Sequence, residues 1–405
     1  MRLLFINETH PDSRHVAGMR LNRFATALIE RGHEVVQVTG PAPGHPSGTR
    51  TTHDVAPKLI SLAAPVTREE KSAVMRRVNT ALRLTRSDRA TDEWLNLARG
   101  QTLGALGDFR PQLIWATFGN VYSLLLARRL AREWGCPWII DAKDNWESFN
   151  RRGLRAIVAR RFASAAGLTA NSRLHRDIAK RYFPGSAVEL VYSGVAEPFY
   201  RARQAGHQDP SGTRTLLLVG GTYRRAILDQ YLGAIADWLR TLSATDQARF
   251  RLRYAGADHD VVADAAAAKG LLAVADITPA IPLDALADLV RTSFCATYLW
   301  SPHTFHHKLL ELLVAGQAVV AFPGEHAESV EFAGQCDTPF AVARDRASLI
   351  EQLSLLWAAA PQSATRRAAP RWRWGDFADG LEAFFEAILS SKHSAADKQR
   401  HEVER

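Results

Sequence analysis

Two charged side chains in the C-terminal half of the chain stand three residues apart in a segment whose pattern predicts a helix, a turn and a buried strand. Lys308 and Glu311 can project from one face of a short helix, because residues three apart are neighbours on a helix surface. Gly316 then ends the helix, AVVAF is typical of a buried parallel strand, and PGE opens a loop at its carboxyl end. In open α/β sheets, ligands bind at this edge. The segment therefore predicts a binding site, although a surface salt bridge on an ordinary helix–turn–strand unit would give the same pattern.

Two adjacent arginines follow the apolar run TLLLVGG, which predicts a strand. Arg224 and Arg225 stand where the next helix is expected to start, and a guanidinium fork there can neutralise a diphosphate group. Preorganised positive charge of this kind contributes strongly to catalysis at phosphate-type leaving groups. The alternative is a plain pair of surface charges at a helix start.

Polar side chains also gather in the N-terminal half, where strands are expected to end. The loop ETHPDSRHVAG follows the apolar run RLLFIN and offers either substrate contacts or an ordinary solvated loop. Because parallel strands have their carboxyl ends at one edge of the sheet, polar residues at later strand ends should line the same edge. The loop candidates are His10, Asp12, Arg14 and His15, and the later positions are Thr117, Asp141, Asn171 and Ser193.

Three histidines, His303, His306 and His307, stand just before Lys308. We predict no metal site from them, because no carboxylate or cysteine completes a compact ligand set. The three cysteines of the chain are too few and too scattered for a disulfide framework. A reduced, cytosolic protein is the interpretation that this favours.

Strands and helices alternate in two successive blocks. The first block opens with RLLFIN, a helix closed by Gly32, and HEVVQVTG, a βαβ start that predicts a parallel sheet. After a variable polar region, the alternation continues to VELVYSG. A second alternation runs from TLLLVGG to AVVAF, and no sequence repeat relates it to the first.

The predicted fold class is α/β, with two Rossmann-like parallel-sheet domains. The polar segment between the blocks holds Gly, Pro and Ser without periodicity and is the predicted linker. The expected organisation is an N-terminal domain at 1–200, the linker at 201–214, a C-terminal domain at 215–375, a helix at 376–390 that packs back toward the N-terminal domain, and a flexible tail at 391–405.

Length and composition agree with this organisation. A chain of 405 residues exceeds the usual size of a single core, and 46% hydrophobic with 23% charged residues is an ordinary globular composition. No apolar run approaches the roughly 18 residues needed to span a bilayer. MRLLFIN is too short for a signal peptide and predicts a first strand.

Positive charge is concentrated in the N-terminal half. Residues 1–198 carry 29 Lys and Arg against 18 Asp and Glu, for a net charge of +11, whereas residues 199–405 carry 22 against 24, for −2. Such a patch attracts anionic lipid headgroups, nucleic acid or an anionic substrate, or it is a set of solvated helix faces. No nucleic-acid motif accompanies it, so we predict no nucleic-acid partner. The basic residues are Arg76, Arg77, Arg83, Arg86 and Arg89, and then Arg151, Arg152, Arg155, Arg160 and Arg161.

Several segments together resemble the retaining nucleotide-sugar glycosyltransferases of the GT-B superfamily, in particular its family 4-like members. KLLELLVAGQAVVA is similar to their K-L-x-E-Y-x-A-x-G-x-P-V-x-A-like run. VAGMRLNRFATALIERGHEVVQVTG resembles their glycine loop, helix and second strand, PWIIDAKDNW their D-x-x-D-x-W segment, and VYSGVAEPFY their N-G-V-D-x-x-x-F strand end. LLLVGGTYRR is similar to the strand and loop that hold the donor diphosphate. The resemblance implies the GT-B architecture, two Rossmann-like domains facing each other across a cleft.

The resemblance also implies roles for single residues. Glu311 would hold the ribose hydroxyls of the donor, since an ionised carboxylate is an acceptor only. His303 stands where many relatives carry a glutamate, and Thr117 ends a strand where relatives often carry a histidine. No catalytic nucleophile can be named, and no metal or other cofactor is expected beyond the nucleotide sugar as co-substrate. The implied donor-binding residues are Gly18, Arg224, Arg225, His303, Lys308 and Glu311, and the acceptor-binding residues are His10, Asp12, Arg14, Thr117 and Asp144.

The function implied by the resemblance is transfer of a sugar from a nucleotide-diphosphate donor to a hydroxyl of a glycan or lipid-linked acceptor, with retention of configuration. The synthesis of cell-surface polysaccharide or glycolipid would fit, in the cytoplasm or at the inner face of the cell membrane, which the basic N-terminal domain could contact. Two alternatives stay open. A nucleotide-sugar epimerase shares the architecture but would carry paired carboxylates and a histidine across the cleft, and a non-catalytic GT-B protein would bind nucleotide or glycan without transfer.

Overall fold

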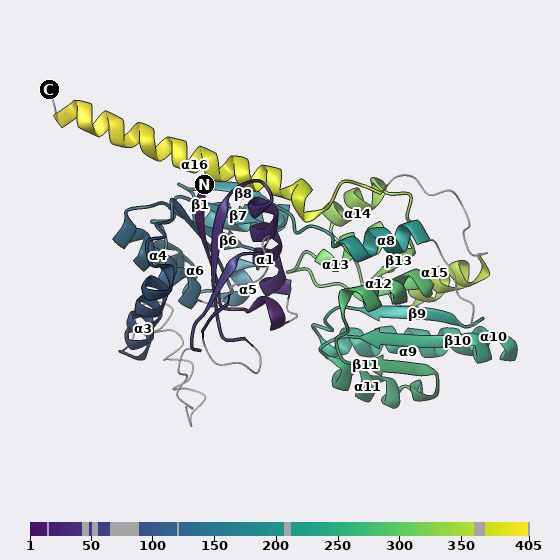
Figure 1. The fold of residues 1–405 in the computed structure, drawn as a ribbon. Coiled ribbons are helices and arrows are strands. Elements are labelled where there is room, and N and C mark those ends of the chain that lie inside the picture. The colour runs from purple at the N-terminus through teal and green to yellow at the C-terminus, as the bar shows by residue number, and fades with distance from the viewer. Residues whose placement is uncertain are drawn as a thin grey trace. The chain divides into compact units, whose positions relative to one another are not determined.

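The chain forms two compact units, each built on a mainly parallel sheet. The computed structural model describes residues 1–13, 16–42, 48–50, 56–64, 89–119, 121–205, 212–359 and 369–403. The first unit comprises Met1–Ser193 and Trp374–Arg405, and the second comprises Gly194–Arg373. The predicted α/β class with two Rossmann-like parallel sheets is confirmed (Figure 1).

The first unit has an eight-stranded sheet in the order β3-β4-β2-β1-β5-β6-β7-β8, in which only β3 is antiparallel to its neighbour. Each of the central strands is a run of apolar residues, as expected for strands that are covered on both faces. The strand order reverses direction between β1 and β5, so the carboxyl ends of these two strands form a topological switch point. The strands are β1 (Arg2–Asn7), β2 (Glu34–Thr39), β3 (Gly48–Arg50), β4 (Lys58–Ser61), β5 (Leu113–Thr117), β6 (Trp138–Ala142), β7 (Gly167–Ala170) and β8 (Ala187–Leu190).

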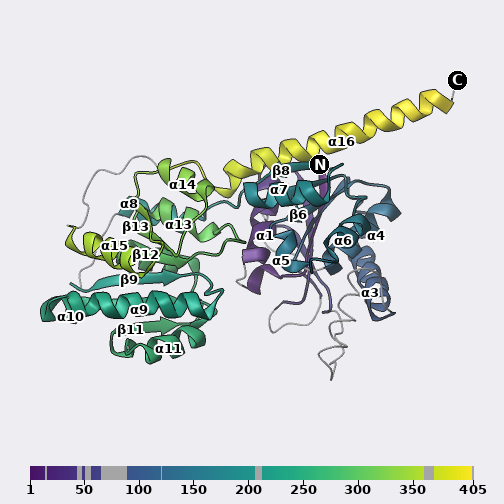
Figure 2. The same cartoon turned by 180° about the vertical axis from the view of Figure 1, so that it is seen from behind.

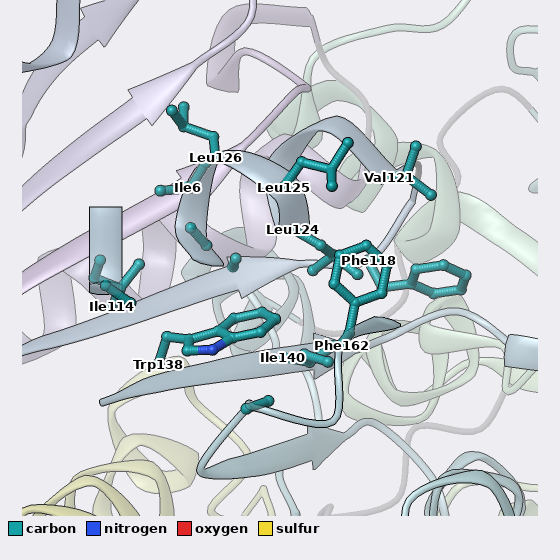
Figure 3. Packing of buried hydrophobic residues seen from close by; sticks show 14 of the residues in the cluster. Ile6, Ile114, Phe118, Val121, Leu124, Leu125, Leu126, Trp138, Ile140 and Phe162 are labelled. Atoms are coloured by element: carbon teal, nitrogen blue, oxygen red, sulfur yellow. The ribbon is translucent and has the colours of Figure 1, made fainter. Parts of the chain in front are cut away.

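Helices cover both faces of this sheet (Figures 1 and 2). One core joins Leu4 and Ile6 of β1 to α3, α4, α6 and α7, and Figure 3 shows Phe118 and Phe162 within it. The alternate side chains, such as Phe5 and Trp115, pack on α1 and α16 from the other face. The helices are η1 (Pro11–Ser13), α1 (Val16–Ile29), α3 (Arg89–Leu106), α4 (Val121–Trp134), α5 (Trp146–Phe149), α6 (Arg155–Arg161), α7 (Arg173–Tyr182) and α16 (Trp374–Val403).

The second unit has a six-stranded, all-parallel sheet in the order β11-β10-β9-β12-β13-β14. Its switch point lies between β9 and β12. The strands are β9 (Arg214–Val219), β10 (Phe250–Ala255), β11 (Ala275–Thr278), β12 (Ser293–Leu299), β13 (Ala318–Phe322) and β14 (Phe340–Val342). The helices are α8 (Glu197–Ala205), α9 (Arg225–Thr241), α10 (Ala244–Arg249), α11 (His259–Ala268), η2 (Leu272–Val274), α12 (Leu283–Thr292), α13 (His307–Ala315), α14 (Ala327–Gly334) and α15 (Arg346–Ala358).

Two expected boundaries differ from the structure. The segment predicted as a linker, 201–214, begins inside α8, because Phe199 and Tyr200 are buried and fix that helix to the second unit. The C-terminal helix does not end at residue 390 but continues to Val403, so the residues expected as a tail are largely helical. That stretch contains no Gly or Pro to stop a helix. None of the described helices is long and apolar enough to span a bilayer.

Candidate functional site

Helix α13 of the second unit carries the Lys308–Glu311 pair that the spacing predicted. The Lys308 Nζ donates a hydrogen bond of 2.7 Å to Glu311 Oε2, and His307 Nε2 lies 3.4 Å from Oε1. Glu311 is only 1% exposed, so the alternative of a surface salt bridge is wrong. Burial alone would raise the pKa of Glu311, but Lys308 and His307 outweigh it and hold the pKa at about 2. The helix therefore presents a fully ionised carboxylate among buried residues.

The turn after α13 has the predicted form. Gly316 adopts the left-handed conformation with φ of 82°, and its backbone N–H donates to the carbonyl of Leu312. A residue with a side chain is disfavoured there. The turn sends the chain directly into β13, whose carboxyl end leads to Gly324 and Glu325.

The loop after β9 places the two predicted arginines at the switch point of the second sheet. Thr222 anchors this loop, because its backbone N–H and its hydroxyl both donate to Asp258 Oδ2, at 2.8 and 3.1 Å. Arg224 is the N-cap residue of α9 and is exposed, and its guanidinium has no ion-pair partner in the part of the chain that the structure describes. Arg225 is also exposed but donates to Asp229 Oδ1 at 2.9 Å. Arg224 is therefore the arginine that is free to bind an anion at this edge.

A buried histidine joins this loop to the end of β12. The backbone N–H of Ser301 donates to His306 Nε2 at 3.0 Å, so the proton of the neutral ring belongs on Nδ1. That Nδ1 lies 3.5 Å from the hydroxyl of Tyr223, whose φ of 47° is unusual for a residue with a side chain. Burial is the main cause that lowers the pKa of His306 to about 3, and the charge of His326 is the second cause. The ring is thus neutral at physiological pH.

A second carboxylate, that of the half-buried Glu325, is linked to this histidine through Tyr298, whose ring centroid lies 5.3 Å from that of His306. The hydroxyl of Tyr298 donates to Glu325 Oε2, and the backbone N–H of His326 donates to Oε1 at 2.7 Å. Burial raises the pKa of Glu325 above its ordinary value. Gly324 is required here, since a Cβ would lie 3.1 Å from ring atoms of Trp300. Sequence reasoning missed Tyr223, Tyr298 and Glu325, and the only local signal was the PGE loop at the strand end.

His303 lies in the exposed loop that precedes α13. Its backbone N–H lies 3.4 Å from Ser301 Oγ, to which it donates. The structure thus brings Lys308 and Glu311 together, and it puts Arg224 and Arg225 at the start of α9 and His303 in a loop at the same sheet edge. The donor-binding roles assigned to these residues stay predictions.

In the first unit, the loop after β1 packs tightly against the start of α1. A Cβ on Gly18 would lie 2.5 Å from the carbonyl oxygen of His10, so the position requires glycine for this close approach. Asn7 supports the loop by donating to the carbonyl of Ala17 at 2.9 Å. Close packing against His10 thus explains why glycine is needed at position 18, and the role of Gly18 in donor binding stays a prediction.

The predicted acceptor-binding residues have different surroundings. His10 is buried, and its Nδ1 accepts the backbone N–H of Asp12 at 3.1 Å, whereas the carboxylate of Asp12 is exposed. Thr117 is buried at the end of β5, and no described residue hydrogen-bonds its hydroxyl. Arg14 and His15 lie outside the described residues, as do Arg76, Arg77, Arg83 and Arg86.

A carboxylate cluster lies at the switch point of the first sheet. Asp144 Oδ2 pairs with the ammonium of Lys143, and a Cβ on Gly119 would lie 3.3 Å from Glu8 Oε1 and 4.0 Å from Asp144 Oδ2. Burial raises the pKa of Glu8, the charge of Lys143 opposes this, and the charge of Asp144 adds to it. Glu8, which the sequence did not single out, is therefore held near the predicted Asp144.

A cavity of about 380 Å³ opens beside Glu8. Its walls come from the ends of β1 and β2, from the segment after β4, and from α3 and α4. Trp94 and Tyr122 lie edge to face in this wall, with ring centroids 5.0 Å apart. Aromatic and aliphatic walls with a few polar groups are typical of small-molecule sites.

A buried ion pair between α1 and β6 stabilises the sheet next to this edge. Arg20 on α1 donates from Nε to Asp141 Oδ2 and from Nη2 to Oδ1, both at 3.0 Å, and from Nη1 to Ser193 Oγ at 2.9 Å. Thr169 donates to the same Asp141 at 2.9 Å. Asp141 and Ser193 were expected to line the edge, but they are buried and bound to Arg20, so they brace the sheet and offer no free group to a ligand.

Comparisons with known proteins agree with this architecture. Residues 17–194 match the model of the glycosyl transferase 4-like domain. No curated protein sequence matches the chain. Among solved structures, sucrose-phosphate synthase from Thermosynechococcus elongatus is similar, with a TM-score of 0.63, 14% identity and coverage of 99% of this chain and 100% of that chain.

Two further solved structures share the fold. Anabaena HepE, solved in complex with UDP and glucose, has a TM-score of 0.57 and 11% identity, covering 99% of this chain and 100% of that chain. A putative UDP-N-acetylglucosamine 2-epimerase from Listeria monocytogenes has a TM-score of 0.58 and 12% identity, covering 95% and 97%. At these identities the likeness shows the fold alone.

The two sheets and their switch points thus define a protein of the GT-B fold. The matched model agrees with the resemblance that the sequence suggested: residues 17–194 are similar to the glycosyl transferase 4-like domain, in a chain that has the GT-B fold.

Proposed function

We propose that this glycosyltransferase transfers a sugar from a nucleoside-diphosphate donor bound by the second unit. The observation that carries the proposal is that one sheet edge holds both a buried, ionised Glu311 and an exposed Arg224 whose guanidinium has no ion-pair partner among the described residues. An ionised carboxylate accepts hydrogen bonds from two vicinal hydroxyls, as a ribose offers. A guanidinium binds the diphosphate and stabilises the negative charge that develops on it as the glycosidic bond breaks.

The positive charge at this edge comes from the chain itself. The guanidinium of Arg224 can neutralise charge on the diphosphate in the way a metal ion does in other enzymes, so we propose that transfer needs no added metal. The helix dipole of α9, whose N-terminus lies at Arg224, acts in the same direction. We further propose that the reaction retains the anomeric configuration.

The acceptor belongs, in this proposal, to the first unit. The cavity beside Glu8 has room for a sugar or an apolar group, and Trp94 and Tyr122 give it aromatic walls. Glu8 and Asp144 are positioned to orient an acceptor hydroxyl. We propose a glycan or a lipid-linked glycan as acceptor, in the synthesis of cell-surface polysaccharide or glycolipid.

The proposed location is the cytoplasm, at the inner face of the cell membrane. All three cysteines are free thiols, which fits a reducing compartment. The net positive charge of the N-terminal half favours an anionic membrane surface.

The test is turnover of a panel of sugar donors. We would measure release of UDP, GDP and ADP from their common sugar conjugates by the wild type, by Glu311→Ala and by Arg224→Ala, with a membrane lipid extract as acceptor. One released diphosphate, lost in both variants, supports the proposal. Conversion of a UDP-sugar into its epimer would instead favour an epimerase, and binding without any product would favour a non-catalytic protein.

A further inference from the structure

Helices α5 and α6 of the first unit expose apolar side chains among arginines. Phe149 is 53% exposed and Ile157 is 46% exposed. Arg151, Arg152 and Arg160 are exposed as well, and none of the three has a carboxylate partner among the described residues. We refer to these five residues as the α5–α6 surface.

The apolar members of this surface are turned away from the core that their own helices build. Val158 and Ala159 of α6 are buried, while the preceding Ile157 is not. In α5 it is Trp146 that is buried, whereas the exposed Phe149 makes an edge contact with Phe118 of the core, at 5.7 Å between ring centroids. Single exposed apolar residues need no explanation. Phe149 and Ile157, however, lie on consecutive short helices, and Arg151 and Arg152 stand between them in the sequence.

No described carboxylate compensates the positive charge of this surface. The only nearby carboxylate on these helices, Glu147, is already shared by Arg155 at 3.4 Å and Arg181 of α7 at 2.8 Å, and it also accepts from the hydroxyl of Tyr182 at 3.0 Å. These bonds hold α5, α6 and α7 together. From Ser148 to Arg176 the chain contains no Asp or Glu at all.

The surface adjoins the polar edge of the same unit. Helix α5 begins two residues after Asp144, and Phe118, which Phe149 contacts, directly follows the end of β5 at Thr117. A partner bound here would therefore lie beside the edge to which acceptor binding is assigned.

We propose that the α5–α6 surface docks on an anionic lipid bilayer, with Phe149 and Ile157 entering the headgroup region and the three arginines binding lipid phosphates. Cationic side chains without internal partners match the negative potential of such a surface, and exposed apolar groups add hydrophobic attachment. The inference rests on the proposed function in one respect: docking on a bilayer would bring the enzyme to a lipid-linked acceptor.

The test is co-sedimentation of the full chain with lipid vesicles. Phosphatidylcholine vesicles with about 30% phosphatidylglycerol should bind the wild type, and pure phosphatidylcholine vesicles should not. Changing Arg151, Arg152 and Arg160 together to Ser should lower partitioning about a hundred-fold, since each basic residue near the surface contributes about five-fold. The Phe149→Ser/Ile157→Ser variant should lower it at least about ten-fold.

A matched control comes from the second unit, where Leu272 and Leu355 are 54% and 58% exposed. The Leu272→Ser/Leu355→Ser variant should partition like the wild type, and unchanged thermal melting would show that every variant is folded. Equal binding to both vesicle types, no vesicle binding, or a loss only in the arginine variant would each overturn the proposed docking mode. Nucleotide binding measured on the same preparations separates this failure from failure of the proposed function, because the donor residues lie in the second unit.

Discussion

Replacing Lys308 with Met leaves the buried Glu311 carboxylate without the ammonium that lies 2.7 Å away. Burial raises the pKa of Glu311, but Lys308 and His307 together hold it at about 2, against an ordinary value of 4.5. A difference of about 2.5 pKa units corresponds to about 3 kcal/mol. We therefore expect Lys308→Met to lower the free energy of unfolding by about 3 kcal/mol at about pH 8, as expected for a buried pair that loses one member.

The pH dependence gives this prediction its sign. In the wild type the folded pKa of Glu311 is below the unfolded one, so its contribution is complete above about pH 4.5 and is lost as the pH falls toward 2. In Lys308→Met, burial acts with less opposition and moves the folded pKa upward, so the defect is largest at high pH and shrinks as the pH falls. Urea unfolding at about pH 8 and about pH 5.5 measures both values.

The double variant Lys308→Met/Glu311→Gln is the matched control. It replaces the unpaired carboxylate of Glu311 with a neutral amide, so it should recover part of the stability that Lys308→Met loses and show little pH dependence. A loss in Lys308→Met below about 1 kcal/mol, as is usual for an exposed ion pair, would show that Glu311 is not a buried ion.

Three further variants test the surroundings of the two edges. Because burial and the charge of His326 lower the pKa of His306 to about 3, below its ordinary value of 6.5, native stability should fall as the pH drops through that range. His306→Gln should flatten this slope in thermal melts, and an unchanged slope would show that His306 is not the group responsible. Burial raises the pKa of Glu8, so its ionisation destabilises the fold as the pH rises above 4.5. Glu8→Gln should therefore have a higher melting temperature than the wild type at neutral pH. The same variant should transfer sugar at least about ten-fold more slowly. Arg20→Met leaves the fully buried Asp141 without its cation and should lower the free energy of unfolding in urea by about 3–5 kcal/mol. A loss near zero would contradict the ion pair.

The sheets could be predicted because buried parallel strands are continuous apolar runs with turn residues at their ends. RLLFIN, LIWAT and AVVAF all form strands, and the residues after them form the sheet edges. The segment after β2 is harder to predict, because KLIS is short and α3 is rich in polar residues. Its pattern therefore predicts a variable polar region in place of β4 and α3.

The site was predictable only where its residues are close in the sequence. Spacing on one helix predicted the Lys308–Glu311 contact, but the depth of burial depends on neighbouring helices and was not visible in the pattern. Arg20 and Asp141 are 121 residues apart, and Tyr223 and His306 are 83 apart, so no local pattern links them. Such contacts follow from the strand order at the switch points, which the sequence did not fix.

The central claim is that the second unit binds a nucleoside diphosphate through Arg224 and Glu311. Isothermal titration of UDP, GDP and ADP into the wild type, Arg224→Ala and Glu311→Gln tests it most directly. Leu355→Ser serves as a control elsewhere in the same unit. We expect one diphosphate to bind the wild type and the control alike, with at least about ten-fold weaker binding in each site variant, the loss expected for a charge-assisted hydrogen bond. No binding by the folded wild type, or equal binding by all four proteins, would contradict the assignment of this site.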